Sequence, residues 1–155
     1  MISFRRSPIV LSLLVLLSSG LVSCSENLKV AACNKIIEIS NPVTPTPDSN
    51  ATFSPQEALQ KADRAFRKAK QLEAIALQDP QLQEYKNRFA QLYQQEGEAL
   101  KQAAQAALEA QGIPATDPKF AEESLKVADL YLKATEVYQQ HRSTLQEFTR
   151  YCQTQ

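Results

Sequence analysis

Apolar and small residues recur at alternating steps of three and four along most of the chain. The pattern runs from Ala58 to Ala76, from Leu82 to Ala110 and from Val127 to Cys152. Steps of three and four place such residues on one face of an α-helix. A seven-residue repeat kept over three long segments predicts antiparallel helices that pack against one another at shallow angles.

Local signals predict where these helices begin and end. Ser54, Pro55 and Glu57 form a capping box with a proline in the first turn. Asp79–Pro80 and Asp117–Pro118 each predict a further helix start, because aspartate caps the free amide groups and proline suits the first turn. Short breaks between long helices are what a helical bundle requires.

A shorter helix is predicted over Leu28–Ile39, followed by a proline-rich linker at 41–53. The expected fold class is therefore all-α, an antiparallel up-down bundle of three long helices plus a short N-terminal helix. The bundle domain is assigned to 33–152, with a tail at 153–155. In such a bundle both chain ends and the turn between Leu77 and Leu82 lie at one end.

The first 23 residues have the organisation of a secretory signal peptide. Arg5 and Arg6 precede an apolar run from Pro8 to Leu17, and small residues follow. The alternative, a transmembrane helix, needs about 20 consecutive apolar residues. The run is too short for that and is interrupted by serines and a glycine, so residues 1–23 are predicted to be removed after export.

The residues Leu21-Val22-Ser23-Cys24 resemble the lipobox of bacterial lipoproteins. The resemblance implies that the Cys24 sulfur receives a diacylglycerol, that cleavage precedes Cys24, and that the new amino group is acylated, for example with palmitate. Residues 24–32 would then be a lipidated tether, and the domain would lie on the periplasmic or lumenal face of a bacterial membrane. The alternative is a cysteine that merely follows a signal peptide.

Composition agrees with a single helical domain that does not bind nucleic acid. Removing residues 1–23 from the 155 leaves 132, enough for one modest domain. The full chain has 17 basic and 17 acidic residues, and both Arg5 and Arg6 leave with the signal peptide. The mature part is therefore slightly acidic, which is not the balance of a nucleic-acid-binding protein.

Two cysteines remain after Cys24, namely Cys33 and Cys152. Export leads to an oxidising compartment, where a cysteine pair predicts a disulfide. Two free buried thiols are the alternative. A zinc site is not expected, because His141 would bring the nitrogen and sulfur ligands only to three, at irregular spacing. No metal and no other cofactor is predicted.

Glu96 and His141 are the polar members of the predicted core seams. A buried acid and an imidazole can transfer protons. The simpler interpretation is that they hydrogen-bond across the bundle and fix the register of the helices. With no nucleophile motif and no phosphate-binding loop, the chain is expected not to be an enzyme.

Lys61, Arg64 and Lys68 are aligned on one face of the predicted helix that begins at Pro55. A run of like charges is usually solvated surface. The alternative is contact with anionic headgroups or with an acidic protein partner.

The segments "CNKIIEISN", "LEAIALQDPQLQEYKNRFAQLY" and the terminal "RYC" resemble small exported helical proteins of cyanobacteria. This resemblance supports the disulfide and the bundle and brings no functional residue. The expected function is a membrane-anchored lipoprotein acting as a structural or protein-interaction module of the cell envelope. Two alternatives stay open: a small-ligand-binding bundle, and an accessory subunit of a thylakoid or envelope membrane complex.

Overall fold

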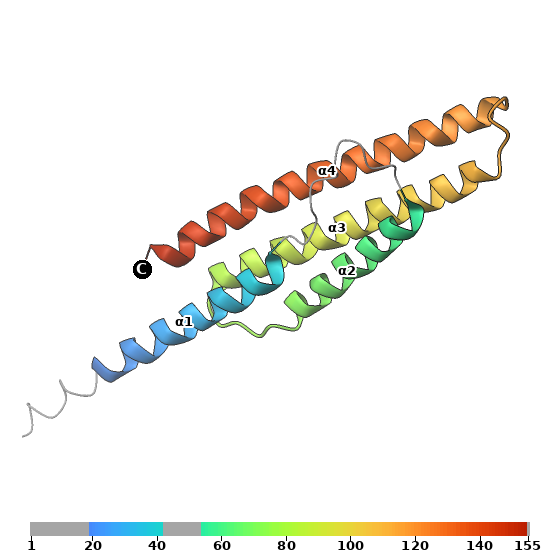
Figure 1. Cartoon of the computed structure of the whole chain (residues 1–155). Helices are drawn as coiled ribbons and strands as arrows, with labels where there is room; N and C mark the ends of the chain where they lie inside the picture. The colour runs from blue at the N-terminus through green and yellow to red at the C-terminus, as the bar shows by residue number, and fades with distance from the viewer. Residues whose placement is uncertain (1–18, 42–53, 155) are drawn as a thin grey trace, which may run out of the picture.

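Four helices make up the described part of the protein (Figure 1). The computed structural model describes residues 19–41 and 54–154, with side chains from Leu28 onward. The helices are α1 (Ser19–Ser40), α2 (Pro55–Glu73), α3 (Pro80–Gln111) and α4 (Pro118–Gln153). Within these residues there is no strand, and α2, α3 and α4 pack together as an all-α bundle. The predicted fold class is confirmed.

The three long helices begin where the sequence predicts. The Ser54 hydroxyl accepts a hydrogen bond from the Glu57 amide at 3.4 Å. The Asp79 carboxylate accepts from the amides of Gln81 and Leu82 at 2.8 and 3.0 Å. Asp117 caps α4 in the same way, through the Lys119 amide at 2.9 Å. Side-chain oxygens thus satisfy amides that have no partner within the helix.

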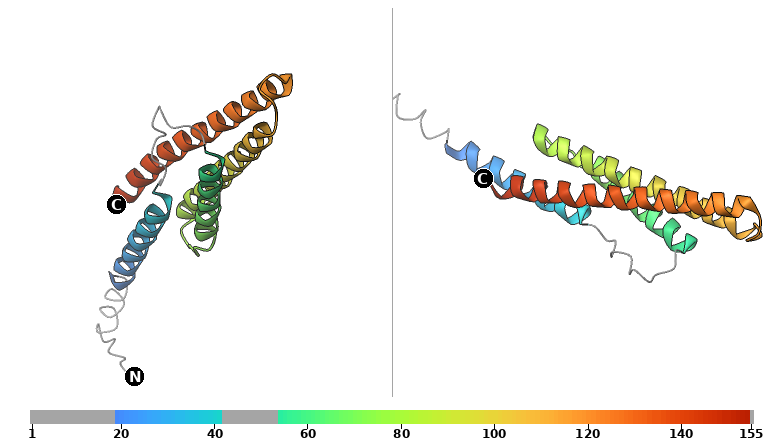
Figure 2. Two further views of the ribbon diagram at one scale, coloured as in Figure 1. Left: turned by 45° about the vertical axis from the view of Figure 1, so that its right-hand side comes forward. Right: turned by 90° about the horizontal axis from the view of Figure 1, so that it is seen from above.

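Helix α3 lies between α2 and α4, antiparallel to both (Figures 1 and 2). In the described ranges the backbones of α2 and α4 do not come close to each other, and α3 is the central helix of the core. Helix α1 contacts all three other helices at one end of the bundle. The bundle is therefore built from α2, α3 and α4 and is completed to four helices where α1 docks, while α3 and α4 extend beyond the shorter α2 towards the α3–α4 loop (Figure 1).

Because α3 has a neighbour on two sides, it buries two faces. The face predicted from the sequence spacing consists of Leu82, Tyr85, Phe89, Leu92, Glu96, Ala99, Ala103, Ala106 and Ala110. All of these residues are buried except Tyr85, which is half-buried. A second buried series follows the same spacing and consists of Ala90, Tyr93, Gly97, Leu100 and Ala104. At Gly97 the Phe66 ring lies so close that an added Cβ would come within 2.8 Å of it. Glycine is therefore the residue that allows α2 and α3 to approach there.

Two boundaries differ from the prediction. Helix α1 begins at Ser19 rather than Leu28, so the backbone of the predicted 24–32 tether is helical. With 22 residues against 19 in α2, α1 is not the short helix that was predicted. Helix α2 ends at Glu73, and Ile75 rather than Ala76 is buried. The chain turns at Ala74, where the last helical hydrogen bonds close back to Lys70 and Leu72. Beyond this turn the helical spacing no longer decides which side chain faces the core. The remainder of the predicted signal peptide and the linker at 42–53 lie outside the described residues.

The two ends of the bundle are distinct (Figures 1 and 2). The C-terminus, the α2–α3 turn and the N-terminal part of α1 lie at one end, as expected from the up-down topology. The Gly112–Pro118 loop lies at the other. None of the helices in the described ranges is both long enough and apolar enough to cross a membrane.

Candidate functional site

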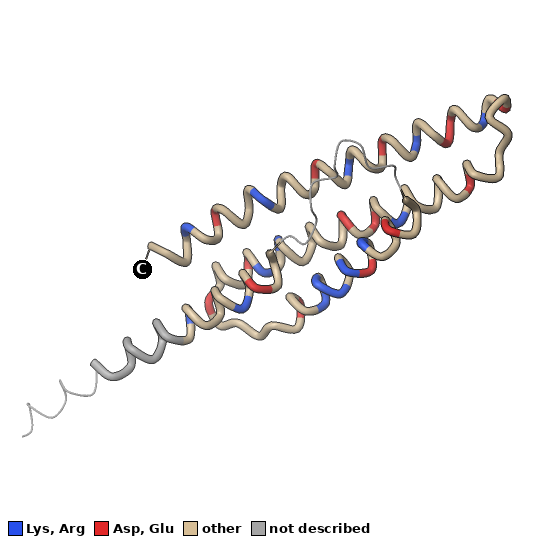
Figure 3. The backbone as a smooth tube through the Cα atoms, in the orientation of Figure 1, with Lys and Arg blue, Asp and Glu red and all other residues tan. Residues whose placement is uncertain are grey.

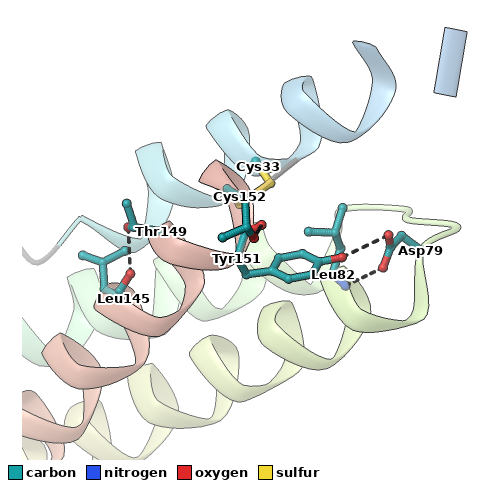
Figure 4. The surroundings of a disulfide bond; sticks show 8 residues. Cys33, Asp79, Leu82, Leu145, Thr149, Tyr151 and Cys152 are labelled. Atoms are coloured by element: carbon teal, nitrogen blue, oxygen red, sulfur yellow. Dashed lines mark hydrogen bonds between the residues drawn. A yellow bond between two sulfur atoms is a disulfide. The ribbon is translucent and has the colours of Figure 1, made fainter. Parts of the chain in front are cut away.

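The first attachment of α1 is a disulfide between Cys33 and Cys152, in the last turn of α4 (Figure 4). Their Cα atoms lie 6.1 Å apart, and Cys33 is buried at 3% exposure. The bond joins positions separated by 119 residues and links α1 to the C-terminal end of α4. The predicted disulfide is confirmed.

Next to the disulfide, Tyr151 joins α4 to the α2–α3 turn. Its hydroxyl donates to the Asp79 carboxylate at 3.3 Å, while Lys29 of α1 lies 4.1 Å from the centre of its ring (Figure 4). The hydrogen bond from the Leu82 amide is the main reason why the pKa of Asp79 is held below its usual value. We call Cys33, Cys152, Tyr151, Asp79 and Lys29 the terminal lock. It ties α1, α4 and the α2–α3 turn together at one end.

The second attachment is at the C-terminus of α1. Three consecutive carbonyl groups there have no partner within the helix, and each accepts a hydrogen bond from a different helix. Tyr93 of α3 donates to the Ile39 oxygen at 3.2 Å, and His141 of α4 donates to the Ser40 oxygen at 3.0 Å. Lys68 of α2 donates to the Asn41 oxygen at 2.6 Å. We call Lys68, Tyr93 and His141 the α1 clamp.

The clamp explains why a histidine lies in the core. His141 is 1% exposed, with the Tyr93 ring at 4.4 Å and the Phe89 ring at 5.3 Å between centroids. Because the Ser40 carbonyl can only accept, Nε2 must carry the proton. Burial lowers the pKa of His141 to about 4, the positive charge of Lys68 adds to this, and the bond to Ser40 opposes it. The imidazole is therefore neutral at ordinary pH.

Lys68 supplies a positive charge at the negative end of the α1 dipole, where α1 itself has no basic residue. Its ammonium also donates to the Tyr93 hydroxyl at 3.2 Å. Burial lowers the pKa of Lys68 and raises that of Tyr93, and the charge of Glu96 favours the protonated form of both. Glu96 thus acts electrostatically on the clamp from α3.

The structure places the predicted site residues in two settings. His141 hydrogen-bonds across the bundle, as expected for a residue that fixes the register of the helices. Glu96 is buried beside the clamp. Lys68 corrects the sequence interpretation: it was expected on an exposed basic face with Lys61 and Arg64, but it is half-buried and caps α1. Arg64 is exposed and Lys61 partly exposed. The Cys24 side chain lies outside the described part.

Sequence reasoning missed the α1 clamp as a unit. One signal was available at the end of α1, where Ser40 and Asn41 are not followed by a capping glycine. The last carbonyl groups of this helix therefore need hydrogen-bond donors from elsewhere in the fold. The three donors are far apart in sequence, so only the tertiary fold could show that they meet there.

Two open grooves flank the docked α1. One, of about 660 Å³, is bounded by Leu28, Lys29, Leu77 and Tyr151, and the other, of about 570 Å³, by Asn41, Arg142 and neighbouring α4 residues. Among the described side chains, no three His, Cys, Asp or Glu residues are placed to hold a metal ion.

The Tyr93 hydroxyl should contribute measurably to the clamp. We expect Tyr93→Phe to lower the free energy of unfolding by about 1 kcal/mol, because the Ile39 carbonyl loses its donor. Tyr138→Phe on α4 is the control, since Tyr138 makes no hydrogen bond within the described ranges. Urea denaturation of both variants checks this. Equal stability of the two would contradict a role for the hydroxyl.

Comparison of the chain with protein-family models, with curated proteins and with solved structures gave no match. Function is therefore inferred from the residues of this chain.

Proposed function

We propose that this protein is an exported bacterial lipoprotein, anchored in a membrane through acylated Cys24, whose bundle is a non-enzymatic structural or protein-interaction module. The observation that carries the proposal is the lipobox-like sequence Leu21–Cys24, which lies near the N-terminus of α1, the helix that the disulfide and the α1 clamp attach to the bundle.

The two attachments suit a domain held by its N-terminal segment. Cys24 precedes the disulfide-bonded Cys33 by nine residues, which is about 14 Å along a continuous α-helix. The terminal lock and the α1 clamp then fix α1 to all three other helices. A force on the anchor would pass into the whole bundle instead of peeling α1 away.

The polar groups of the core support a structural role. The Nε2 proton of His141 is donated to Ser40, and the Tyr93 proton to Ile39. Lys68 donates to Asn41 and Tyr93. The side chains that could transfer protons, His141, Tyr93 and Lys68, are thus occupied in hydrogen bonds that hold the C-terminus of α1.

The alanine-rich interface favours a packed module over the alternative of a ligand cavity within the bundle. Ala62 of α2 packs in one buried cluster with Ala99 of α3 and Ala134 of α4. Small side chains allow helix axes to approach closely, which leaves little volume between them. Crosslinking in intact cells would test for a protein partner: one dominant crosslinked protein supports the module, and none favours the ligand-binding alternative.

Replacing the lipidated cysteine tests the anchor. Because acylation and cleavage both require the Cys24 thiol, we expect Cys24→Ser to accumulate as unprocessed precursor without a lipid modification. Immunoblotting and metabolic labelling with a fatty acid would measure both effects.

Ser25→Ala is the matched control, because it changes the residue next to Cys24 but keeps the Cys24 thiol and the disulfide. It should be processed and acylated like the natural protein. Normal maturation of Cys24→Ser would contradict the proposed anchor.

A further inference from the structure

Helix α2 carries an unbalanced basic surface. Five of the ten residues from Lys61 to Lys70 are Lys or Arg, and Asp63 is the one acid among them (Figure 3). Over its whole length α2 has five basic and three acidic residues, whereas α4 has five of each and α3 three basic and four acidic. The excess of positive charge is therefore confined to one helix.

Four of these side chains face outward. They are Lys61, Arg64, Arg67 and Lys70, of which the last three are exposed and the first partly exposed. We call these four the α2 basic face. Lys68, used by the α1 clamp, is not part of it. None of the four makes an ion pair within the described ranges, although Arg88 and Lys126 elsewhere do.

The spacing makes this surface broad. A residue at every third position rises about 4.5 Å and turns about 60° backwards around the helix at each step. The four cations therefore extend about 14 Å along α2 and cover about half its circumference. Such a spread fits a surface of many anionic groups better than one localised acidic site.

We propose that the α2 basic face rests on the anionic headgroups of the membrane in which Cys24 is anchored. The inference rests on the proposed lipoprotein anchor, which keeps a bilayer next to this domain. The contact is electrostatic and peripheral, because the exposed large apolar residues among the described side chains lie on α1, α3 and α4 and none on α2. The positive charge of the α2 basic face is complementary to the negative charge of anionic headgroups, so anionic lipid is the partner that we propose.

The proposal fixes an orientation. Surface charges act over about 8 to 10 Å at physiological salt, and an upright α1 would separate Cys24 from Cys33 by about 14 Å. The basic face can therefore reach the headgroups only if the bundle tilts onto α2. Helix α4 then faces away from the lipid, because α3 lies between it and α2 (Figure 1).

Single-tryptophan variants test this orientation, because the natural chain contains no tryptophan. Gln60→Trp places a reporter beside the basic face, and Gln139→Trp places a matched reporter on α4; both glutamines are exposed. The full-length lipidated variants are reconstituted in phosphatidylcholine vesicles with or without phosphatidylglycerol. Headgroup-labelled nitroxide lipid serves as the quencher.

We expect strong quenching of the Gln60→Trp reporter in the phosphatidylglycerol vesicles, its loss at high salt, and weak quenching of Gln139→Trp throughout. Adding Arg64→Glu and Arg67→Glu should remove the quenching. Each lost cation should lower the ratio of molecules tilted onto α2 to upright molecules by about fivefold. Lys119→Glu with Lys133→Glu on α4 changes the net charge equally and should have no effect.

Vesicle flotation separates this proposal from the anchor. If the protein floats with both vesicle types but the two tryptophan reporters are quenched equally, the anchor is supported and the basic-face contact is overturned. Protein that floats with neither contradicts both proposals. Quenching that persists after the Arg64 and Arg67 reversals would also overturn the contact. If the same reversals released a bound acidic protein and left the quenching unchanged, the basic face would be a protein-binding surface and the lipid contact would be overturned.

Discussion

Removing the disulfide should cause the largest loss of stability in this protein. With both cysteines replaced, as Cys33→Ala and Cys152→Ala, we expect the free energy of unfolding to fall by about 4 to 5 kcal/mol. The bond joins positions 119 residues apart, so it restricts a large part of the unfolded chain. Urea denaturation of the variant and the natural protein, both without reductant, measures the difference.

The same unfolding curve in the presence of a dithiol reductant is the control. The reduced natural protein should lose about as much stability as the double variant, and the variant itself should not respond to the reductant. Hydrogen exchange should locate the effect, with faster exchange in α1 than in α3, because α1 would lose its covalent link to α4 and keep only non-covalent contacts. An unfolding midpoint that does not change on reduction would contradict this role for the disulfide.

Mild acid should weaken the protein through His141. A histidine whose pKa is 6.5 when unfolded and about 4 when folded stabilises the fold through its neutral form. This contribution is complete above pH 6.5 and is lost as the pH falls from 6.5 towards 4. Its full size is on the order of 3 kcal/mol. Thermal unfolding measured across this range should show the decline.

The groups around His141 help to assign the effect. Lys68 of α2 stays positively charged and Tyr93 of α3 stays neutral over this range, while Glu96 of α3 is the neighbouring acid. The depressed pKa of Asp79 contributes stability that is lost only below its ordinary value of 3.8, outside the window. His141→Gln keeps an N–H donor near the Ser40 carbonyl but does not titrate. A decline that persists in that variant would rule out His141 as its source.

The parts of the fold predicted from sequence are those that depend on local chemistry. Aspartate or serine before proline marks the start of α2, α3 and α4, because a cap acts within one helical turn. The heptad spacing identified a buried face of α2 and of α3. On α4 it identified the buried Ala134, His141 and Phe148, but the other members of the series are half-buried, and the buried Val137 and Thr144 lie outside it. The disulfide was predicted because two cysteines follow Cys24 and because the chain was predicted to be exported.

The parts that were missed depend on which helices meet. The second buried face of α3 exists because this helix has two neighbours, and a single heptad seam shows only one of them. Lys68 looks like surface charge by its position in α2, yet it turns towards the end of α1, where the Asn41 carbonyl accepts its hydrogen bond. The clamp needs α2, α3 and α4 at once, so no local pattern could reveal it.

The most direct measurement is the mass of the N-terminal peptide of the mature protein, purified from the membrane fraction of cells that produce the full chain. If the protein is an anchored lipoprotein, this peptide begins at Cys24 and carries a diacylglycerol and an amide-linked acyl chain. A mature chain that begins elsewhere, or one with an unmodified Cys24, would contradict the anchor and with it the proposed function.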